Sequence, residues 1–120
     1  MIHTLIIEDE MPAAQRLKRM LEELDPSVRV LEILESVSAT VNWLKENAPP
    51  DLMMLDIQLA DGLSFDIFKK VQIDSFVIFT TAYDEYAIKA FELNSIDYLL
   101  KPVDHGKLLH AIEKYKKLSQ

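Results

Sequence analysis

The chain has 120 residues, of which 49% are hydrophobic and none is cysteine, and its formal net charge is −7. This length predicts one compact domain over residues 1–120, and the lack of cysteine excludes disulfide bonds and thiolate metal sites. The negative charge disfavours direct binding of nucleic acid, and no apolar stretch approaches the roughly 20 residues of a membrane span. We therefore expect a cytoplasmic domain with no membrane partner.

The first predicted strand, 2–7, is apolar and ends at three consecutive acids in "LIIEDE". A helix is expected over 11–24, because Pro12 suits a first helical turn and apolar residues recur at helical spacing after it. A mixed strand over 28–34 fits the edge of a sheet, and a helix follows over 37–47. These elements begin an alternation that continues along the chain.

Two almost continuously apolar runs, 51–56 and 76–81, are predicted as buried strands, with a helix over 63–72 between them. Helical spacing then spans 84–93, a fifth strand is expected over 96–101, and a helix over 104–118 follows. The last helix shows no clear stop signal, so the chain could be cut from a longer protein whose C-terminal effector domain is absent here.

Strands that alternate with helices of this length predict βαβ units, a parallel sheet and helices on both faces. We expect an α/β fold of five parallel strands in the order 2-1-3-4-5, flanked by five helices, as in flavodoxin-like proteins. In such a sheet the carboxyl ends of all strands meet at one edge, where ligands bind. The polar residues at these strand ends are Glu8, Asp9, Asp56, Thr80, Thr81 and Lys101.

Carboxylates gathered at that edge would either take up protons or bind a hard cation, and an all-oxygen site suits Mg²⁺. The strand order places Asp56 beside Glu8 and Asp9. A phosphoryl group at Asp56 would meet the cation, the ammonium of Lys101 and the hydroxyl of Thr81. Thr80 offers an equally good hydroxyl, and Asp56 alone could be an ordinary turn residue.

Four sequence pieces also resemble a known family. The acid pair in "LIIEDE", the aspartate in "LMMLDIQLADG", the threonine in "FTTAYDEYAIKAF" and the lysine-proline pair in "DYLLKPVD" are similar to the receiver domains of bacterial two-component response regulators. The resemblance covers essentially the whole chain. The segment "FTTAYDEYAIKAFELNSIDYLLKPV" resembles receivers that precede a LytTR-type DNA-binding domain.

The resemblance implies a role for each matching residue. Asp56 would be the phosphoacceptor, Glu8 and Asp9 would hold Mg²⁺, and the backbone carbonyl of Gln58 would be a further metal ligand. The loop from Asp56 to Gly62 is shorter than in many receivers, which leaves its shape and the placement of Gln58 open.

The same resemblance implies how the domain responds. Thr81 and Lys101 would contact the phosphoryl group, Tyr98 would be the aromatic switch residue, and Lys101–Pro102 would be a cis peptide. A sensor histidine kinase would be the donor. Phosphorylation would promote a homodimer through the face of the fourth helix, fifth strand and fifth helix, and DNA would be bound by a separate effector domain.

Three other functions fit parts of the pattern. A Mg²⁺-dependent phosphatase with an aspartate nucleophile usually needs a second aspartate two residues on, where this chain has Gln58. A nucleotide- or flavin-binding module would place glycines in the turn that here reads "EDEMPAA". A receiver-like module that binds partners without phosphorylation is the third alternative.

Overall fold

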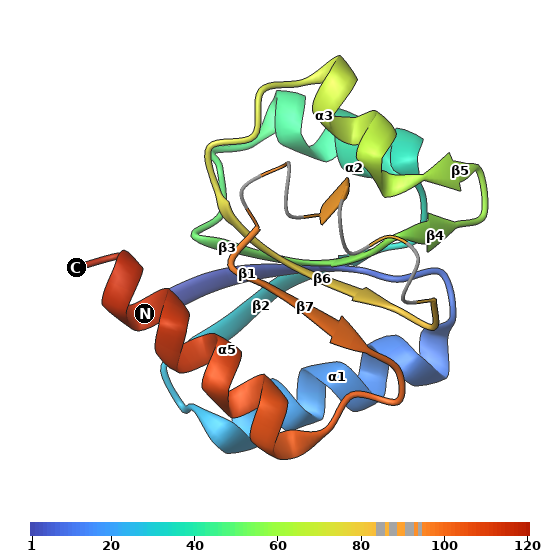
Figure 1. Ribbon diagram of the computed structural model, residues 1–120. Coiled ribbons are helices and arrows are strands. Elements are labelled where there is room, and N and C mark those ends of the chain that lie inside the picture. Colours follow the sequence, from blue (N-terminus) through green and yellow to red (C-terminus); the bar gives the residue numbers. More distant parts are fainter. Residues whose placement is uncertain (84–85, 87–88, 91–92, 94) are drawn as a thin grey trace.

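The computed structural model describes all residues except 84–85, 87–88, 91–92 and 94. Its main sheet contains five parallel strands in the order β2-β1-β3-β6-β7 (Figure 1). These strands are β1 (Ile2–Ile7), β2 (Val28–Leu34), β3 (Leu52–Asp56), β6 (Phe76–Thr81) and β7 (Asp97–Leu100). Counted among the sheet strands alone, this order is the predicted 2-1-3-4-5, so the predicted α/β fold is confirmed.

Helices cover both faces of the sheet (Figure 1). On one face lie α1 (Met11–Leu24) and α5 (His105–Leu118), which share a core with alternate residues of the strands. On the other face lie α2 (Val37–Glu46) and α3 (Ile67–Lys70), over a second core. All of β3 is buried between these cores, as its unbroken apolar run predicts. The helix predicted over 84–93 lies largely outside the described residues.

Polar contacts tie α1 to the chain around α5 at two places. Near the carboxyl edge of the sheet, Nη2 of Arg16 donates a hydrogen bond to the backbone oxygen of Val103 at 3.2 Å. At the other end of α1, the ammonium of Lys116 forms an ion pair with Asp25. Asp25 also accepts hydrogen bonds from the backbone nitrogen and hydroxyl of Ser27, at 2.9 and 2.6 Å. The two helices are therefore fastened at both ends.

The segment after β3 differs from the helix predicted over 63–72. It first forms a hairpin of β4 (Gln58–Leu59) and β5 (Gly62–Leu63), then the 3-10 turn η1 (Ser64–Asp66), and only then the short helix α3. The backbone nitrogen of Ser64 donates to the oxygen of Ile57 at 2.8 Å, which closes the hairpin. Gly62 has φ = 143°, a conformation that suits glycine and not a helix.

Smaller boundary differences have simple causes. The last helix begins one residue later than predicted, because Asp104 is its N-cap and accepts a hydrogen bond from the backbone nitrogen of Lys107 at 3.0 Å. Strand β7 ends at Leu100, so Lys101 follows the strand instead of ending it. Within the described part of the chain, no helix is long and apolar enough to span a membrane.

Candidate functional site

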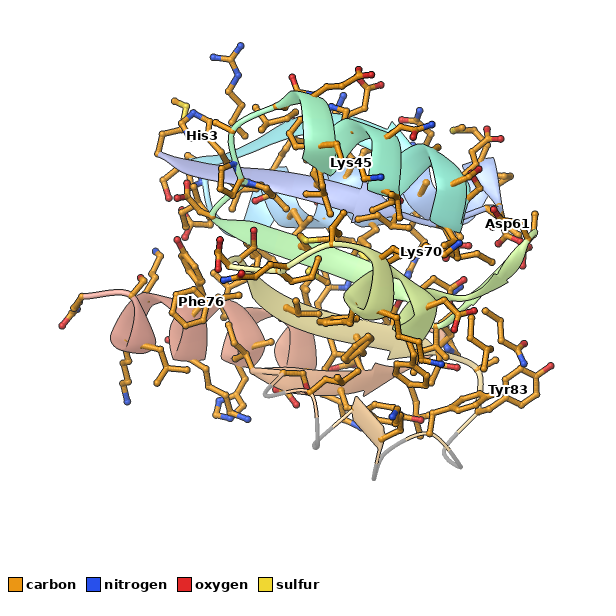
Figure 2. All side chains as sticks on the ribbon, turned by 90° about the horizontal axis from the view of Figure 1, so that it is seen from above. His3, Lys45, Asp61, Lys70, Phe76 and Tyr83 are labelled. Atoms are coloured by element: carbon orange, nitrogen blue, oxygen red, sulfur yellow. The ribbon has the colours of Figure 1, made fainter. Side chains whose placement is uncertain are left out.

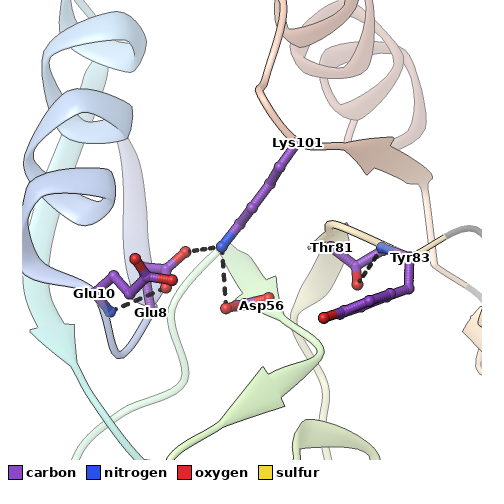
Figure 3. Close-up of polar contacts among 6 residues, drawn as sticks. All are labelled: Glu8, Glu10, Asp56, Thr81, Tyr83 and Lys101. Atoms are coloured by element: carbon purple, nitrogen blue, oxygen red, sulfur yellow. Dashed lines mark hydrogen bonds and ion pairs between the residues drawn. The ribbon is translucent and has the colours of Figure 1, made fainter.

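Four of the predicted site residues, Glu8, Asp56, Thr81 and Lys101, lie near one another at the carboxyl edge of the sheet (Figure 3). Glu8 and Asp9 follow β1, Asp56 is the last residue of β3, and Thr81 is the last residue of β6. Lys101 follows β7, where its backbone nitrogen donates to the oxygen of Thr81 at 2.7 Å. The parallel register thus brings together residues that are far apart in the sequence.

Lys101 reaches between two buried carboxylates. Its Nζ contacts Oε1 of Glu8 and donates to Oδ2 of Asp56 at 3.1 Å (Figure 3). Glu8 and Asp56 are only 4% and 6% exposed, so water screens these contacts little. Burial lowers the pKa of Lys101, but its two carboxylate partners outweigh this effect and raise the pKa overall. The lysine is therefore a fixed positive charge in the site.

The two carboxylates respond to this lysine differently. Burial raises the pKa of Glu8, but hydrogen bonds from Lys101 and from the backbone of Glu10 reverse the effect and lower it. Burial and the charge of Glu8 raise the pKa of Asp56 to about 7, against the opposing effect of Lys101. Asp56 is thus a carboxylate whose negative charge lacks full compensation, which makes it the group that gains most from an additional cation.

A pocket of about 300 Å³ opens beside Asp56. Of the two neighbouring threonines, Thr81 lines this pocket, whereas Thr80 lines a different pocket of about 460 Å³ on the α1 side. Glu8 lies on the side of Thr80, and Lys101 borders both pockets. The residues around the Asp56 pocket are Asp9, Glu10, Asp56, Gln58, Leu59, Thr81, Ala82, Tyr83 and Lys101.

The acids after β1 suit a divalent cation. Glu8, Asp9 and Glu10 each place a carboxylate oxygen within 4.8 Å of the other two. Burial and the neighbouring charge of Glu8 raise the pKa of Asp9, which shows that the cluster repels further negative charge. An oxygen-only donor set of this kind fits Mg²⁺. Glu10, which is exposed, was not predicted as a member, because three consecutive acids do not reveal which carboxylates lie close together.

Tyr98 is linked to the site through Tyr83. The hydroxyl of Tyr98 donates to the backbone oxygen of Tyr83, whose backbone nitrogen donates to Oγ1 of Thr81 at 3.2 Å. Tyr98 itself is half-buried and packs against the core beneath α2 and α3. The Lys101–Pro102 peptide bond is cis, as the resemblance implied.

Two aromatic residues outside the predicted metal-binding, phosphoryl-contacting and switch residues border the site. Tyr83 is 48% exposed and lines the Asp56 pocket. Tyr86 receives a hydrogen bond at its hydroxyl from Nε2 of Gln58 at 3.1 Å. The sequence gives no signal for the contact between Tyr86 and Gln58. For Tyr83 it gives only the position, two residues after Thr81.

Comparisons with known proteins identify the family of the chain. The response regulator receiver domain family matches residues 4–113. The chain is 38% identical to the sensory transduction protein LytT of Bacillus cereus, covering all of this chain and 49% of that protein. It is 37% identical to the sensory transduction protein LytR of Staphylococcus haemolyticus, covering 94% of this chain and 44% of that protein. The chain thus spans about half the length of these relatives.

Solved structures show the same fold. The response regulatory domain of protein mrkE from Klebsiella pneumoniae superimposes with a TM-score of 0.83 at 26% identity, covering 98% of this chain and 97% of that one. The non-phosphorylated HemR receiver domain from Leptospira biflexa superimposes with a TM-score of 0.77 at 30% identity, covering 96% and 94%. Both the predicted fold and the predicted family resemblance are confirmed.

Proposed function

The chain belongs to the response regulator receiver domain family, and from this we propose that it is a switch controlled by phosphorylation of Asp56. The observation that carries the proposal is the setting of Asp56. Its carboxylate is buried at a strand end, contacts Lys101 at 3.1 Å and borders a pocket that Thr81 also lines. A phosphoryl group in that pocket would meet both of these side chains.

The proposed reaction transfers a phosphoryl group from a phosphohistidine of a sensor histidine kinase. An oxygen of Asp56 attacks the phosphorus, the bond from phosphorus to the imidazole nitrogen breaks, and the imidazole leaves with the electron pair. Lys101 stays beside the accepting oxygen and balances the added negative charge. Mg²⁺, when held by Glu8, Asp9, Asp56 and the backbone carbonyl of Gln58, would neutralise charge on the phosphoryl oxygens. Glu10 belongs with Glu8 and Asp9 to the acid cluster after β1.

The proposed response begins at Thr81. Its hydroxyl accepts a hydrogen bond from the backbone of Tyr83, which in turn accepts one from Tyr98. If Thr81 turns to the phosphoryl group, this chain of contacts must rearrange, which gives Tyr98 its role in the switch. A ligand shifts such an equilibrium by its differential affinity for the two states, and contacts made in only one state supply that difference.

We propose that residues 1–120 form one regulatory domain whose only catalysis is its own phosphorylation and dephosphorylation. The changed surface would include β7 and α5, and it would favour a homodimer. The relatives are about twice as long as this chain. An effector domain beyond the receiver, of the LytTR type, would then bind DNA in the cytoplasm, which agrees with the net charge of −7 on these residues.

The test is the intact mass of the protein after incubation with acetyl phosphate and Mg²⁺. We expect the wild type to gain one phosphoryl group and the Asp56→Asn variant to gain none. Asp74→Asn is the matched control, since Asp74 is an exposed aspartate away from the site. An unchanged gain in Asp56→Asn would place the acceptor elsewhere, and a gain without Mg²⁺ would contradict the metal's role.

A further inference from the structure

The hairpin after β3 is fastened to α2 by a side chain at its turn. Asp61 accepts hydrogen bonds from the backbone nitrogens of Val37, at 2.7 Å from Oδ1, and Ser38, at 3.1 Å from Oδ2. Figure 2 shows Asp61 at the hairpin tip, beside the end of α2. These bonds lower the pKa of Asp61, that from Val37 most strongly. The carboxylate therefore stays ionised and holds two segments that are 24 residues apart in the sequence.

The same helix end has a second, local cap. Oγ of Ser36 accepts a hydrogen bond from the backbone nitrogen of Ala39 at 3.0 Å, and the oxygen of Ser36 accepts one from the nitrogen of Thr40 at 3.1 Å. Ser36 thus serves α2 without touching the hairpin strands in any contact of the described residues. The two caps allow the stability of α2 to be separated from the position of the hairpin.

The hairpin in turn presents Gln58 to the site. The backbone nitrogen of Ser64 donates to the oxygen of Ile57 at 2.8 Å, and the nitrogen of Ile57 donates to the oxygen of Thr80 in β6 at 3.0 Å. The start of the hairpin is thus tied both to its own second strand and to the main sheet. Gln58 is the next residue and pairs with Leu63. Gln58 lines the Asp56 pocket.

From these contacts we propose that Asp61 is a positioning residue that holds the backbone carbonyl of Gln58 in place for Mg²⁺. The inference rests on the proposed function. A ligand supplied by the backbone cannot be tuned by its own side chain, so its position depends on what fixes the loop. Three features fix the loop. Gly62 forms its turn, and Leu59 is buried in the same core as Val37. Asp61 accepts a hydrogen bond from the first residue of α2.

The experiment is a titration of the metal-free protein with Mg²⁺ alone, followed by the NMR shifts of backbone amides. We expect Asp61→Ala to raise the Kd for Mg²⁺ by about tenfold, the lower end of the effect of losing an outer support of a metal ligand. Ser36→Ala removes a cap from the same helix and should stay within about twofold of wild type. Asp74→Ala removes the same charge at an exposed distant site and should also stay within about twofold.

Amide hydrogen exchange in the absence of Mg²⁺ gives an independent reading of the hairpin. The amide of Ser64, which closes the hairpin, should exchange several-fold faster in Asp61→Ala and at the wild-type rate in Ser36→Ala.

An unchanged Kd in Asp61→Ala would overturn the inference while leaving the proposed function intact, provided that the wild type binds Mg²⁺. An equal rise of the Kd in Ser36→Ala would also overturn it, because Mg²⁺ affinity would then depend on the stability of α2 and not on the contact of Asp61. If the wild type bound no Mg²⁺, the proposed metal site and this inference would both fail.

Discussion

Replacing Asp56 by asparagine should stabilise the metal-free protein at neutral and higher pH. The pKa of Asp56 in the folded protein is about 7, whereas 3.8 is the ordinary value. At about 1.4 kcal/mol for each tenfold change in proton affinity, the folded state disfavours the ionised carboxylate by about 4 kcal/mol. The attraction of Lys101 is already included in this shifted pKa, so we expect a net gain of about 4 kcal/mol.

The sign of the pH dependence follows from the direction of the shift. An acid whose pKa is raised by folding binds its proton more tightly in the folded state, so wild-type stability falls as the pH rises from about 4 to about 7. The asparagine variant escapes this loss. The two proteins should therefore be similarly stable near pH 4, and the advantage of Asp56→Asn should reach its full size above about pH 7.

Urea unfolding in the presence of a chelator, followed by circular dichroism at several pH values, measures the difference directly. Asp25→Asn is the control, because its free energy of unfolding should change in the opposite direction. Burial raises the pKa of Asp25, but Lys116 and Ser27 outweigh it and lower the pKa, so its ionised form contributes stability that is lost as the pH falls through that lowered pKa. Asp25→Asn should thus be less stable than wild type at about pH 8, by about 1 to 3 kcal/mol.

Two results would refute the reasoning. One is an Asp56→Asn variant that is less stable than wild type at about pH 8, and the other is a stability difference that does not change between about pH 4 and pH 8. Saturating Mg²⁺ should narrow the difference, because the cation stabilises the wild type by binding its folded state and binds the variant more weakly.

Two further substitutions test the switch and the hairpin. Thr81→Ala should still accept a phosphoryl group, but its phosphorylated form should lack the change in self-association that the phosphorylated wild type shows in size-exclusion chromatography. If Thr81→Ala responds like the wild type, Thr81 has no part in the switch. Thr80→Ala, measured in parallel, would show whether the neighbouring hydroxyl acts instead. Gly62→Ala should lower the urea midpoint by an amount equivalent to about 1 to 3 kcal/mol, because φ = 143° is strained for a residue with a Cβ atom. An unchanged midpoint would show that the turn relaxes without cost.

The sequence predicts the sheet and most of the site because both follow from short-range patterns and one topological rule. Apolar runs identify the strands, and the parallel arrangement puts every strand end at the same edge. Asp56 and Lys101 could therefore be placed together although 45 residues separate them. Thr81 and Thr80 could not be ranked by pattern alone. Neighbouring residues of β6 face opposite sides of the sheet, and the pattern does not tell which side holds the Asp56 pocket.

The loop after β3 was beyond such rules. Leu63 and Ile67 have helical spacing, but Leu63 lies in β5 because Ser64 bonds back to Ile57. Strands of two residues carry no periodicity that a sequence could reveal. The role of Asp61 could not be predicted either. Its partners are backbone nitrogens at the start of α2, more than 20 residues earlier in the sequence, and backbone groups leave no pattern in a sequence.

The fastening of α1 to α5 limits how this domain can transmit a change. Arg16 binds the segment before α5 through Val103, and Lys116 forms an ion pair with Asp25 at the opposite end, so two polar contacts connect the helices. A tilt of α5 against the sheet must either break one of these contacts or move α1 as well. The two contacts therefore favour movement of α1 and α5 together over movement of α5 alone.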